Sequence, residues 1–282
     1  MNPGSVLVTG AGGFLGRELV LQLKAAGWTV YSAVRRNRLH DMEIELDLED
    51  VRFSSCLEDL PRLDAIVHLA AKVDFSASKL SSLFQTNIVA TASLAEFARR
   101  RGIRLIFASS ALVAGARATR ILHDSSPNAD TTYASSKWIA ESLISASGVS
   151  GAVLRIGGIF GLNGPSHLGL NRAIHSVVSR QPPELVGSGA PRRNYIYVKD
   201  VAATIAEVLR RDITGTHLVA GREILSVDEM LTSLCEVFLP GAAPLRREGH
   251  AGSDQLIDPS PDLPQARAFR AALEDMRAEA GR

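Results

Sequence analysis

The stretch Ser5–Gly16, with the sequence SVLVTGAGGFLG, decides the fold. Its apolar run Val6–Val8 is too short for a helix and passes directly into a glycine-rich turn, which the amphipathic segment Arg17–Ala26 follows. This order predicts a buried parallel strand, a tight turn and a helix. A second strand-like run, Trp28–Val34, completes a βαβ unit.

Three glycines in the turn, Gly10, Gly13 and Gly16, are spaced three residues apart. In dinucleotide-binding folds the first such glycine forms the turn, the second lets the backbone approach a pyrophosphate, and the third lets the helix pack on the strand. The N–H groups at the start of the helix bind the phosphates. Glycines also occur in ordinary turns, but a strand before them and a helix after them favour a dinucleotide site.

Size, composition and charge limit the remaining possibilities. The chain has 282 residues, of which 46% are hydrophobic, enough for one large domain or for a domain with a small addition. Its net charge of +1 provides no electrostatic basis for binding a nucleic acid or a membrane. The two cysteines, Cys56 and Cys235, indicate neither a disulfide framework nor a metal site. Because the sequence has no membrane-spanning run and no signal-peptide pattern, we expect a cytoplasmic protein.

Strands and helices alternate to about residue 160, which predicts an α/β fold with a doubly wound parallel sheet, the Rossmann arrangement. The further strands expected here are Met42–Leu46, Ala65–Ala71, Arg104–Ala108 and Ala152–Arg155, and the helices are Leu83–Arg101 and Tyr133–Ser147. The later pattern is looser, with helices expected over Leu170–Ser179 and Gln265–Glu279 and a return of Tyr195–Arg210 to the main sheet. We expect a dinucleotide-binding domain over residues 1–160, to which 193–212 return, and a smaller C-terminal substrate-binding lobe over 161–192 and 213–282.

Tyr133 and Lys137 are four residues apart, so both lie on one face of the expected helix. A free tyrosine has a pKa of ~10, but a neighbouring ammonium stabilises the phenolate and lowers that pKa. The pair therefore makes Tyr133 a candidate general acid or base. Ser110 ends the preceding strand, where α/β folds place active-site groups, and its hydroxyl can bind the substrate oxygen that Tyr133 protonates.

With these motifs the chain resembles the extended short-chain dehydrogenases/reductases of the NAD-dependent epimerase/dehydratase family. The matching segments follow the family's order over most of residues 5–210. They are TGAGGFLG (Thr9–Gly16), the turn Asp47-Leu48, HLAA (His68–Ala71), NIVAT (from Asn87), SSALVAG (Ser109–Gly115), YASSK (Tyr133–Lys137), LRIGGIFG (Leu154–Gly161) and YIYVKDVA (Tyr195–Ala202).

The resemblance implies roles for individual residues. Ser110, Tyr133 and Lys137 would be catalytic, and Asn87 would support the lysine through the active-site network. The cofactor would contact Tyr133, Lys137, the three glycines and Phe14, Leu15, Asp47, Leu48, Leu69, Ala70, Ala71, Ile156 and Ile159. The substrate would contact Ser110, Tyr133 and Arg193, whose counterpart in sugar-nucleotide members binds the diphosphate; a plain surface arginine is the alternative for Arg193.

The second strand ends in Val34-Arg35-Arg36 and has no carboxylate for the ribose hydroxyls, which NAD-preferring folds place there. Arg35 and Arg36 suit a 2′-phosphate by charge and by bidentate geometry. A strand-end arginine in solvent would look the same in the sequence. The site chemistry therefore favours NADP, with NAD as the alternative.

Departures from the family's pattern narrow the reaction. The positions after Ser109-Ser110 lack the Asp-Glu pair of sugar-nucleotide dehydratases, which disfavours elimination of water. We expect an NADP(H)-dependent oxidoreductase that interconverts a ketone and a secondary alcohol, such as a nucleotide-sugar 4-ketoreductase. A nucleotide-sugar 4-epimerase and a non-catalytic dinucleotide-binding regulator remain open. The family often dimerises through the two helices that would be Leu83–Arg101 and Tyr133–Ser147, so the resemblance also implies a homodimer.

Overall fold

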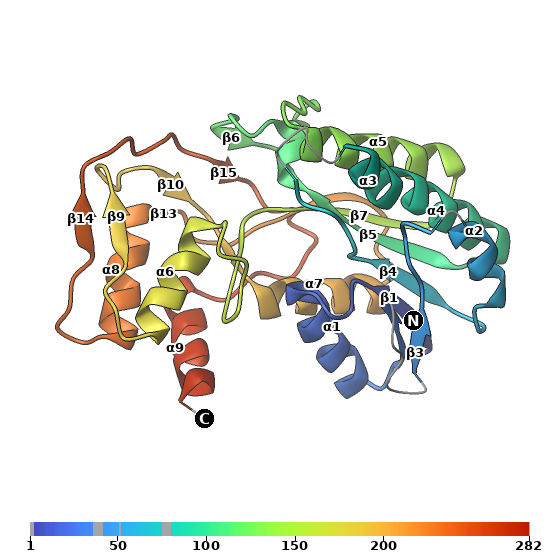
Figure 1. The fold of residues 1–282 in the computed structure, drawn as a ribbon, viewed down its shortest axis with the longest axis horizontal. Helices are drawn as coiled ribbons and strands as arrows, with labels where there is room; N and C mark the ends of the chain where they lie inside the picture. Colours follow the sequence, from blue (N-terminus) through green and yellow to red (C-terminus); the bar gives the residue numbers. More distant parts are fainter. Residues whose placement is uncertain (1–2, 36–41, 51, 75–79, 282) are drawn as a thin grey trace. The chain divides into compact units, whose positions relative to one another are not determined.

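The computed structural model describes residues 3–35, 42–50, 52–74 and 80–281. The chain divides into two compact units (Figure 1). The first comprises Met1–Ala116, Ser126–Arg155 and Ala202–His217, and the second comprises Arg117–Ser125, Ile156–Val201 and Leu218–Arg282. The assignment of a dinucleotide-binding role to one part of the chain and a substrate-binding role to another stays a prediction.

A seven-stranded sheet lies almost entirely within the first unit, in the order β12-β7-β5-β4-β1-β2-β3. The strands are β1 (Ser5–Thr9), β2 (Thr29–Val34), β3 (Glu43–Glu45), β4 (Ala65–His68), β5 (Arg104–Ser110), β7 (Gly151–Ile156) and β12 (Gly215–Val219). β1 pairs in parallel with both β2 and β4, so the winding direction reverses between β1 and β4. This confirms the doubly wound fold and makes the carboxyl ends of β1 and β4 the expected place for a ligand.

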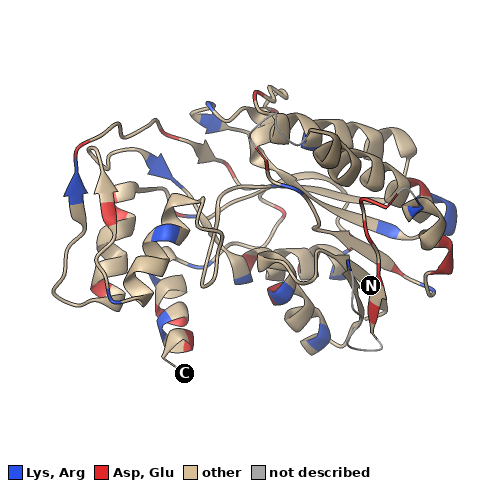
Figure 2. Ribbon diagram, viewed as in Figure 1, with Lys and Arg blue, Asp and Glu red and all other residues tan. Residues whose placement is uncertain are grey.

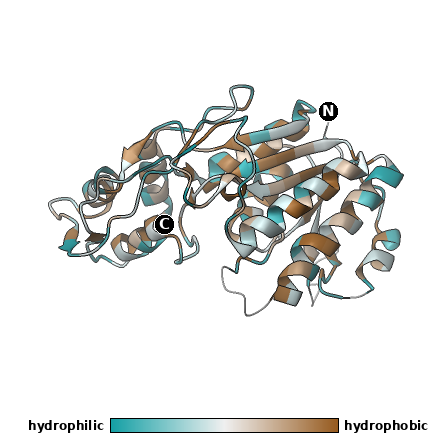
Figure 3. Cartoon of the chain, turned by 90° about the horizontal axis from the view of Figure 1, so that it is seen from above, coloured by the Kyte–Doolittle hydropathy of each residue, from teal (hydrophilic) through white to brown (hydrophobic). Residues whose placement is uncertain are grey.

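Helices cover both faces of this sheet (Figure 1). α1 (Phe14–Ala25) and the part of α7 (Val198–Arg210) from Ala202 onward lie on one face, and α4 (Ala90–Arg101) and α5 (Thr132–Ser147) lie on the other. Short helical segments are α2 (Phe53–Cys56) and the 3-10 turns Leu57–Asp59 and Ala111–Ala114. Hydrophobic residues are concentrated on the strands (Figure 3), as expected for a sheet buried on both faces.

The structure replaces the expected helix Leu83–Arg101 with three segments. They are α3 (Leu80–Phe84), a π-helical turn (Gln85–Val89) and α4. The wider π turn buries Thr86, Asn87 and Ile88 in succession, which a regular helix with its period of 3.6 does not do. The prediction of one continuous helix was therefore wrong at the turn that carries Asn87.

The segment Tyr195–Arg210 does not form a strand of the large sheet. It holds β11 (Ile196–Tyr197), which pairs with β8 (Ile159–Phe160), and then α7. β12 is the strand that joins the large sheet after α7, and the sequence reasoning did not identify it. Its residues Gly215–His217 include two exposed positions, which weakens the apolar signal of a buried strand.

The second unit consists of helices and small two-stranded sheets. Among the described residues, it contains the first residues of α7, up to Val201, and three complete helices. These are α6 (Gly169–Val178), α8 (Val227–Phe238) and α9 (Phe269–Ala280). The remaining strand pairs are β10 (Arg192–Arg193) with β13 (Leu225–Ser226), β14 (Leu245–Arg247) with β9 (Glu184–Val186), and β15 (Leu256–Ile257) with β6 (Arg120–Ile121). α8 begins with a capping box, in which the Ser226 and Glu229 side chains bind each other's backbone N–H groups.

Basic and acidic residues are interspersed along the described elements (Figure 2). Within the described ranges, no helix is long and apolar enough to cross a bilayer. The same residues contain no cluster of three or more His, Cys, Asp or Glu side chains that could hold a metal ion.

Candidate active site

The glycine turn between β1 and α1 is shaped by steric demands. Gly10 has a φ of +71°, and a Cβ on it would lie 2.8 Å from the Ala70 nitrogen. A Cβ on Gly16 would lie 2.1 Å from the Gly10 carbonyl oxygen. The Gly13 N–H donates to that same oxygen at 2.9 Å and closes the turn. Gly10 and Gly16 are therefore required by backbone geometry and close packing.

The N-terminus of α1 fits a pyrophosphate. Its N-cap, Gly13, has no side chain to bind the first N–H groups, and no acidic residue lies in the first turn. Phe14 and Leu15 begin the helix and are half-buried. The N–H groups and the positive end of the helix dipole are thus not compensated by a carboxylate, as an anion site requires.

Leu69, Ala70 and Ala71 follow β4 and are half-buried. The Leu69 N–H donates to the Thr9 carbonyl at 3.3 Å, and the Ala70 N–H donates to the Thr9 hydroxyl at 3.2 Å. This segment therefore lies directly beside the glycine turn, with small side chains that let a ligand approach. Together with the helix N-terminus, it fits a dinucleotide.

Arg35 is exposed at the end of β2, while Arg36 lies outside the described residues. Leu48 is buried, and the Asp47 carboxylate accepts a bond of 3.0 Å from the Glu49 N–H. Hydrogen bonds from Lys72 and Ser82 lower the pKa of Glu49, and the charge of Arg35 contributes in the same direction. Glu49 is thus a carboxylate near Arg35 that the sequence reasoning missed, because it follows β3 and not β2.

The structure brings Lys137 beside Tyr133 on α5. The Lys137 Nζ donates to the Ala108 carbonyl at 2.7 Å and lies 5.9 Å from the centre of the Tyr133 ring. α5 begins where the Thr131 hydroxyl accepts a bond from the Ala134 N–H. This cap sets the helix start so that Tyr133 lies in the first turn.

Burial determines the proton affinities of this pair. It lowers the pKa of Lys137 to about 7, against the opposing charge of Glu141. It raises the pKa of Tyr133 to about 12, so the ammonium does not lower that pKa as the sequence reasoning expected. The expectation failed because desolvation of the phenolate outweighs the nearby charge. Tyr133 is therefore protonated at neutral pH, as a general acid must be.

Ser110 ends β5 and is buried, and its Oγ accepts a bond of 3.2 Å from the Leu112 N–H. The neighbouring Ser109 hydroxyl donates to the Glu141 carboxylate. Glu141 also forms an ion pair of 2.8 Å with Arg155, and the two side chains are 6% and 10% exposed. These contacts fasten α5 to β5 and β7. Sequence reasoning missed Glu141, although it lies four residues after Lys137 on the same helix face.

Asn87 is 1% exposed and bonds to two other segments. Its Oδ1 accepts from the Lys72 N–H at 2.8 Å, and its Nδ2 donates to the Lys72 carbonyl at 2.9 Å and to the Ser136 Oγ at 3.0 Å. The Ser136 hydroxyl in turn donates to the Tyr133 carbonyl at 2.7 Å. Asn87 therefore contacts the Tyr133–Lys137 helix through Ser136, and these bonds do not include the lysine ammonium.

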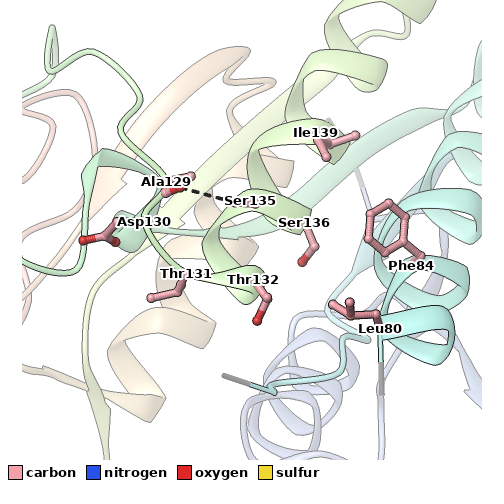
Figure 4. A pocket seen from close by; sticks show the side chains of 9 residues that line it. All are labelled: Leu80, Phe84, Ala129, Asp130, Thr131, Thr132, Ser135, Ser136 and Ile139. Carbon is pink, nitrogen blue, oxygen red and sulfur yellow. Dashed lines mark hydrogen bonds between the residues drawn. The ribbon is translucent and has the colours of Figure 1, made fainter. Parts of the chain in front are cut away.

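A pocket of about 350 Å³ lies beside the start of α5 (Figure 4). Leu80, Phe84 and Ile139 form its apolar walls, and the rest is lined by Ala129, Asp130, Thr131, Thr132, Ser135 and Ser136. The dashed line in Figure 4 marks the bond from the Ser135 hydroxyl to the Ala129 carbonyl. The Ser136 side chain that bonds to Asn87 also lines this pocket.

Three candidate residues belong to the second unit. Ile156 is buried at the end of β7, and Ile159 is half-buried in β8. Arg193 lies in β10, where its guanidinium donates to the carbonyl oxygens of Arg192 and Ser253. The roles of these residues toward a cofactor or substrate stay predictions.

The chain is similar to several known proteins. A relative named ceramide reductase, from Caulobacter vibrioides, is 30% identical over 217 residues, which are 75% of this chain and 63% of that protein, so the match spans less than two thirds of the relative. A dTDP-glucose 4,6-dehydratase from Mycobacterium tuberculosis is 29% identical over 82% of this chain and 77% of its own length. The protein MoeE5, solved in complex with UDP-glucose and NAD, is 27% identical and superimposes with a TM-score of 0.82 over 99% of this chain and 98% of its own.

The model of one family matches the part of the chain that contains the large sheet and both catalytic candidates on α5. The match extends over residues 6–221 and includes the glycine turn, β4 and the segment around Arg193. The chain belongs to the NAD dependent epimerase/dehydratase family.

Proposed function

We propose that the protein is an NADP(H)-dependent oxidoreductase that interconverts a ketone and a secondary alcohol on a nucleotide-linked sugar. The observation that carries the proposal is the placement of Tyr133, protonated at neutral pH, beside the buried Lys137. Ser110 ends the neighbouring strand β5. Proton donor, cation and hydroxyl are the groups that ketone reduction needs from a protein.

The residues have separate tasks in the proposed reaction. A bound nicotinamide dinucleotide supplies or accepts the hydride. The N-terminus of α1 holds the phosphates, and Ala70 and Ala71 leave room for the rest of the dinucleotide. In the reducing direction Tyr133 donates its proton to the substrate oxygen, while the Ser110 hydroxyl orients that oxygen. Lys137, anchored by the Ala108 carbonyl, stabilises the phenolate that forms.

Arg35 supports NADP as the cofactor. Its exposed guanidinium follows β2, where a 2′-phosphate would lie. Glu49, the acidic side chain near it, is already engaged by Lys72 at 2.8 Å. MoeE5 was solved with NAD, so the choice between NADP and NAD is the part of the proposal that a direct titration decides.

A nucleotide-sugar 4-epimerase is the second candidate, because the family includes epimerases and the same three residues can oxidise and then reduce one carbon. An epimerase gains nothing from NADPH, so a preference for NADPH favours the reductase. A non-catalytic regulator would need the dinucleotide site but not Ser110, Tyr133 and Lys137 together. The complex of MoeE5 with UDP-glucose supports a nucleotide sugar as substrate, with Arg193 as the proposed diphosphate contact.

We also propose that two copies of the chain associate through the outer surface of α3 and α5. Six large apolar side chains of these elements and of the π turn are 36–49% exposed: Leu80, Phe84, Val89, Trp138, Ile139 and Leu143. An apolar surface of this kind favours burial against a partner. The proposed location is the cytoplasm, because the two cysteines, Cys56 and Cys235, are free thiols.

The experiment that tests the proposal is a fluorescence and thermal-shift titration of the protein with NADPH and NADH. Each is added with and without UDP-, GDP- and dTDP-sugars. Tighter binding of NADPH, enhanced by one nucleotide sugar, is the expected result. Tighter binding of NADH would discard the Arg35 argument and favour the epimerase, and enhancement by none of the sugars would exclude a nucleotide-sugar substrate from this panel.

A further inference from the structure

A chain of hydrogen bonds runs through the interior of the first unit, from the end of β4 to the π turn. The Ala70 N–H donates to the Thr9 Oγ1 at 3.2 Å, and Thr9 Oγ1 lies 2.6 Å from the Nδ1 of His68. The other ring nitrogen of His68, Nε2, lies 2.9 Å from the Thr91 Oγ1. Thr91 Oγ1 in turn donates to the Asn87 carbonyl at 2.8 Å. Thr9, His68 and Thr91 are each fully buried.

The direction of every hydrogen bond in this row follows from the groups at its two ends, the Asn87 carbonyl and the Ala70 N–H. A carbonyl oxygen only accepts, so the single proton of the Thr91 hydroxyl points at Asn87. Thr91 must then accept from His68, which places the ring proton on Nε2. The unprotonated Nδ1 accepts from the Thr9 hydroxyl, whose oxygen is left to accept from the Ala70 N–H. All donors and acceptors in the chain are thereby matched, with histidine in one tautomer only.

The surroundings of His68 keep the ring neutral. Burial lowers the pKa of His68 to about 3, and the charge of Lys137 acts in the same direction. The ring stacks on Phe107 with 5.6 Å between the ring centres. Both ring nitrogens are hydrogen-bonded, to Thr9 and Thr91, and the side chain has no exposed surface. His68 is therefore not placed to exchange protons with a substrate.

The two ends of this row of hydrogen bonds lie in segments on which the proposed function depends. Ala70 follows β4 and lies against Gly10 of the phosphate-binding turn. Asn87, at the other end, holds the backbone of Lys72 through its side chain and also bonds to Ser136 on α5. Residues 70–72 are thus fixed from both sides, by Thr9 at one end and by Asn87 at the other.

We propose that His68 is a positioning residue for the dinucleotide: as the Nε2–H tautomer, with Thr9 and Thr91, it fixes the Ala70 N–H and the Asn87 carbonyl. It thereby holds residues 70–72 in the conformation that binds the cofactor. The inference rests on the proposed function in that it requires a dinucleotide beside Ala70 and Ala71. Its action on the cofactor is indirect, through the backbone.

The test uses two substitutions of Thr91 and one of Thr86. Thr91→Val keeps the shape of the side chain but removes the hydroxyl between His68 and Asn87, whereas Thr91→Ser retains it. Thr86 lies in the same π turn, and among the described residues its buried hydroxyl has no hydrogen-bond partner. Thr86→Val is therefore a matched control that removes a buried hydroxyl without breaking a bond.

The first readout is the dissociation constant of NADPH, measured by fluorescence, together with the Tm of each variant. We expect Thr91→Val to raise the dissociation constant at least tenfold, and Thr91→Ser and Thr86→Val to leave it within twofold of the wild-type value. A purely structural role predicts instead a lower Tm for Thr91→Val with an unchanged dissociation constant, and this result would overturn the inference. Wild-type protein that binds neither NADPH nor NADH would contradict the proposed function itself.

The second readout needs no ligand. NMR of protein labelled with ¹⁵N-histidine distinguishes a protonated Nε2 from a protonated Nδ1. We expect His68 as the neutral Nε2–H tautomer in the wild type from pH 6 to pH 9, and loss of this single form in Thr91→Val. A protonated Nδ1 in the wild-type protein would overturn the bond directions and the inference with them.

Discussion

Replacing Glu141 with glutamine tests how α5 is held against the sheet. The Glu141 carboxylate receives three bonds from Arg155, at 2.8, 3.1 and 3.2 Å, and a fourth from the Ser109 hydroxyl. Neither charged side chain is more than 10% exposed. Glu141→Gln leaves the guanidinium buried without its counter-charge, which lowers the free energy of unfolding by about 3–5 kcal/mol.

This loss is large compared with the total stability of a domain, about 5–15 kcal/mol. With about 2–4 °C of Tm per kcal/mol for a chain of this size class, the Tm falls by roughly 6–20 °C. Urea denaturation gives the free energy, and calorimetry gives the Tm. Glu58→Gln is the matched control: Glu58 pairs with Arg100 at 2.5 Å, but both side chains are more than 40% exposed, so solvent screens the pair and we expect little change.

A double substitution separates loss of the pair from loss of packing. Glu141→Leu combined with Arg155→Met removes both charges and retains apolar volume, so it restores most of the stability that Glu141→Gln loses. The reasoning is refuted if the free energy of unfolding of Glu141→Gln lies within ~1 kcal/mol of the wild-type value. That result would mean that water or a rearranged partner compensates the charge of Arg155.

Three further predictions concern the cation beside Tyr133, the cofactor and the assembly. Lys137→Met raises the free energy of unfolding at pH 7 by at least ~1 kcal/mol while it abolishes the reaction, because folding of the wild type at this pH must either bury the ammonium or remove its proton. Since the pKa of Lys137 falls from 10.5 to about 7 on folding, the unfolded chain binds more protons between these pH values, and the stability of the wild type rises with pH there. Urea unfolding at pH 7 and pH 10 shows whether Lys137→Met removes that rise. Arg35→Ser weakens NADPH binding by roughly 10- to 100-fold, the loss of one charge-assisted bond, and leaves NADH binding unchanged in a fluorescence titration. Leu143→Glu converts the proposed dimer to a monomer in light scattering, whereas Leu21→Glu, at an exposed position of α1, does not. A Leu143→Glu protein that remains a dimer would contradict the proposed interface.

The fold was predictable because its signals are local. The glycine turn and the Tyr133–Lys137 spacing each lie within a few consecutive residues, and the alternation of strands and helices is built from such short patterns. The structure contains all three features. The π turn was not predictable from periodicity, because it depends on Asn87 finding partners in Lys72 and Ser136, which lie 15 and 49 residues away. β12 was missed for a similar reason: pairing across the sheet, more than its own composition, makes it a strand.

The electrostatics of the site depended on burial, which the sequence does not show. Tyr133 and Lys137 were correctly placed on one helix face, but desolvation raises the pKa of the first and lowers that of the second. The Arg155–Glu141 pair and the His68 chain likewise join residues that are distant in sequence, so only the folded chain shows that they belong to one structure.

The most direct test of the proposed oxidoreductase is the ratio of NADPH consumed to alcohol formed from a nucleotide-linked ketosugar, measured for the wild type and for Tyr133→Phe. We predict one NADPH oxidised per product molecule in the wild type. For Tyr133→Phe we predict a rate at least ~100-fold lower with unchanged NADPH affinity, because only the proton donor is removed. Product formed without net oxidation of NADPH, or undiminished turnover by Tyr133→Phe, would contradict the account.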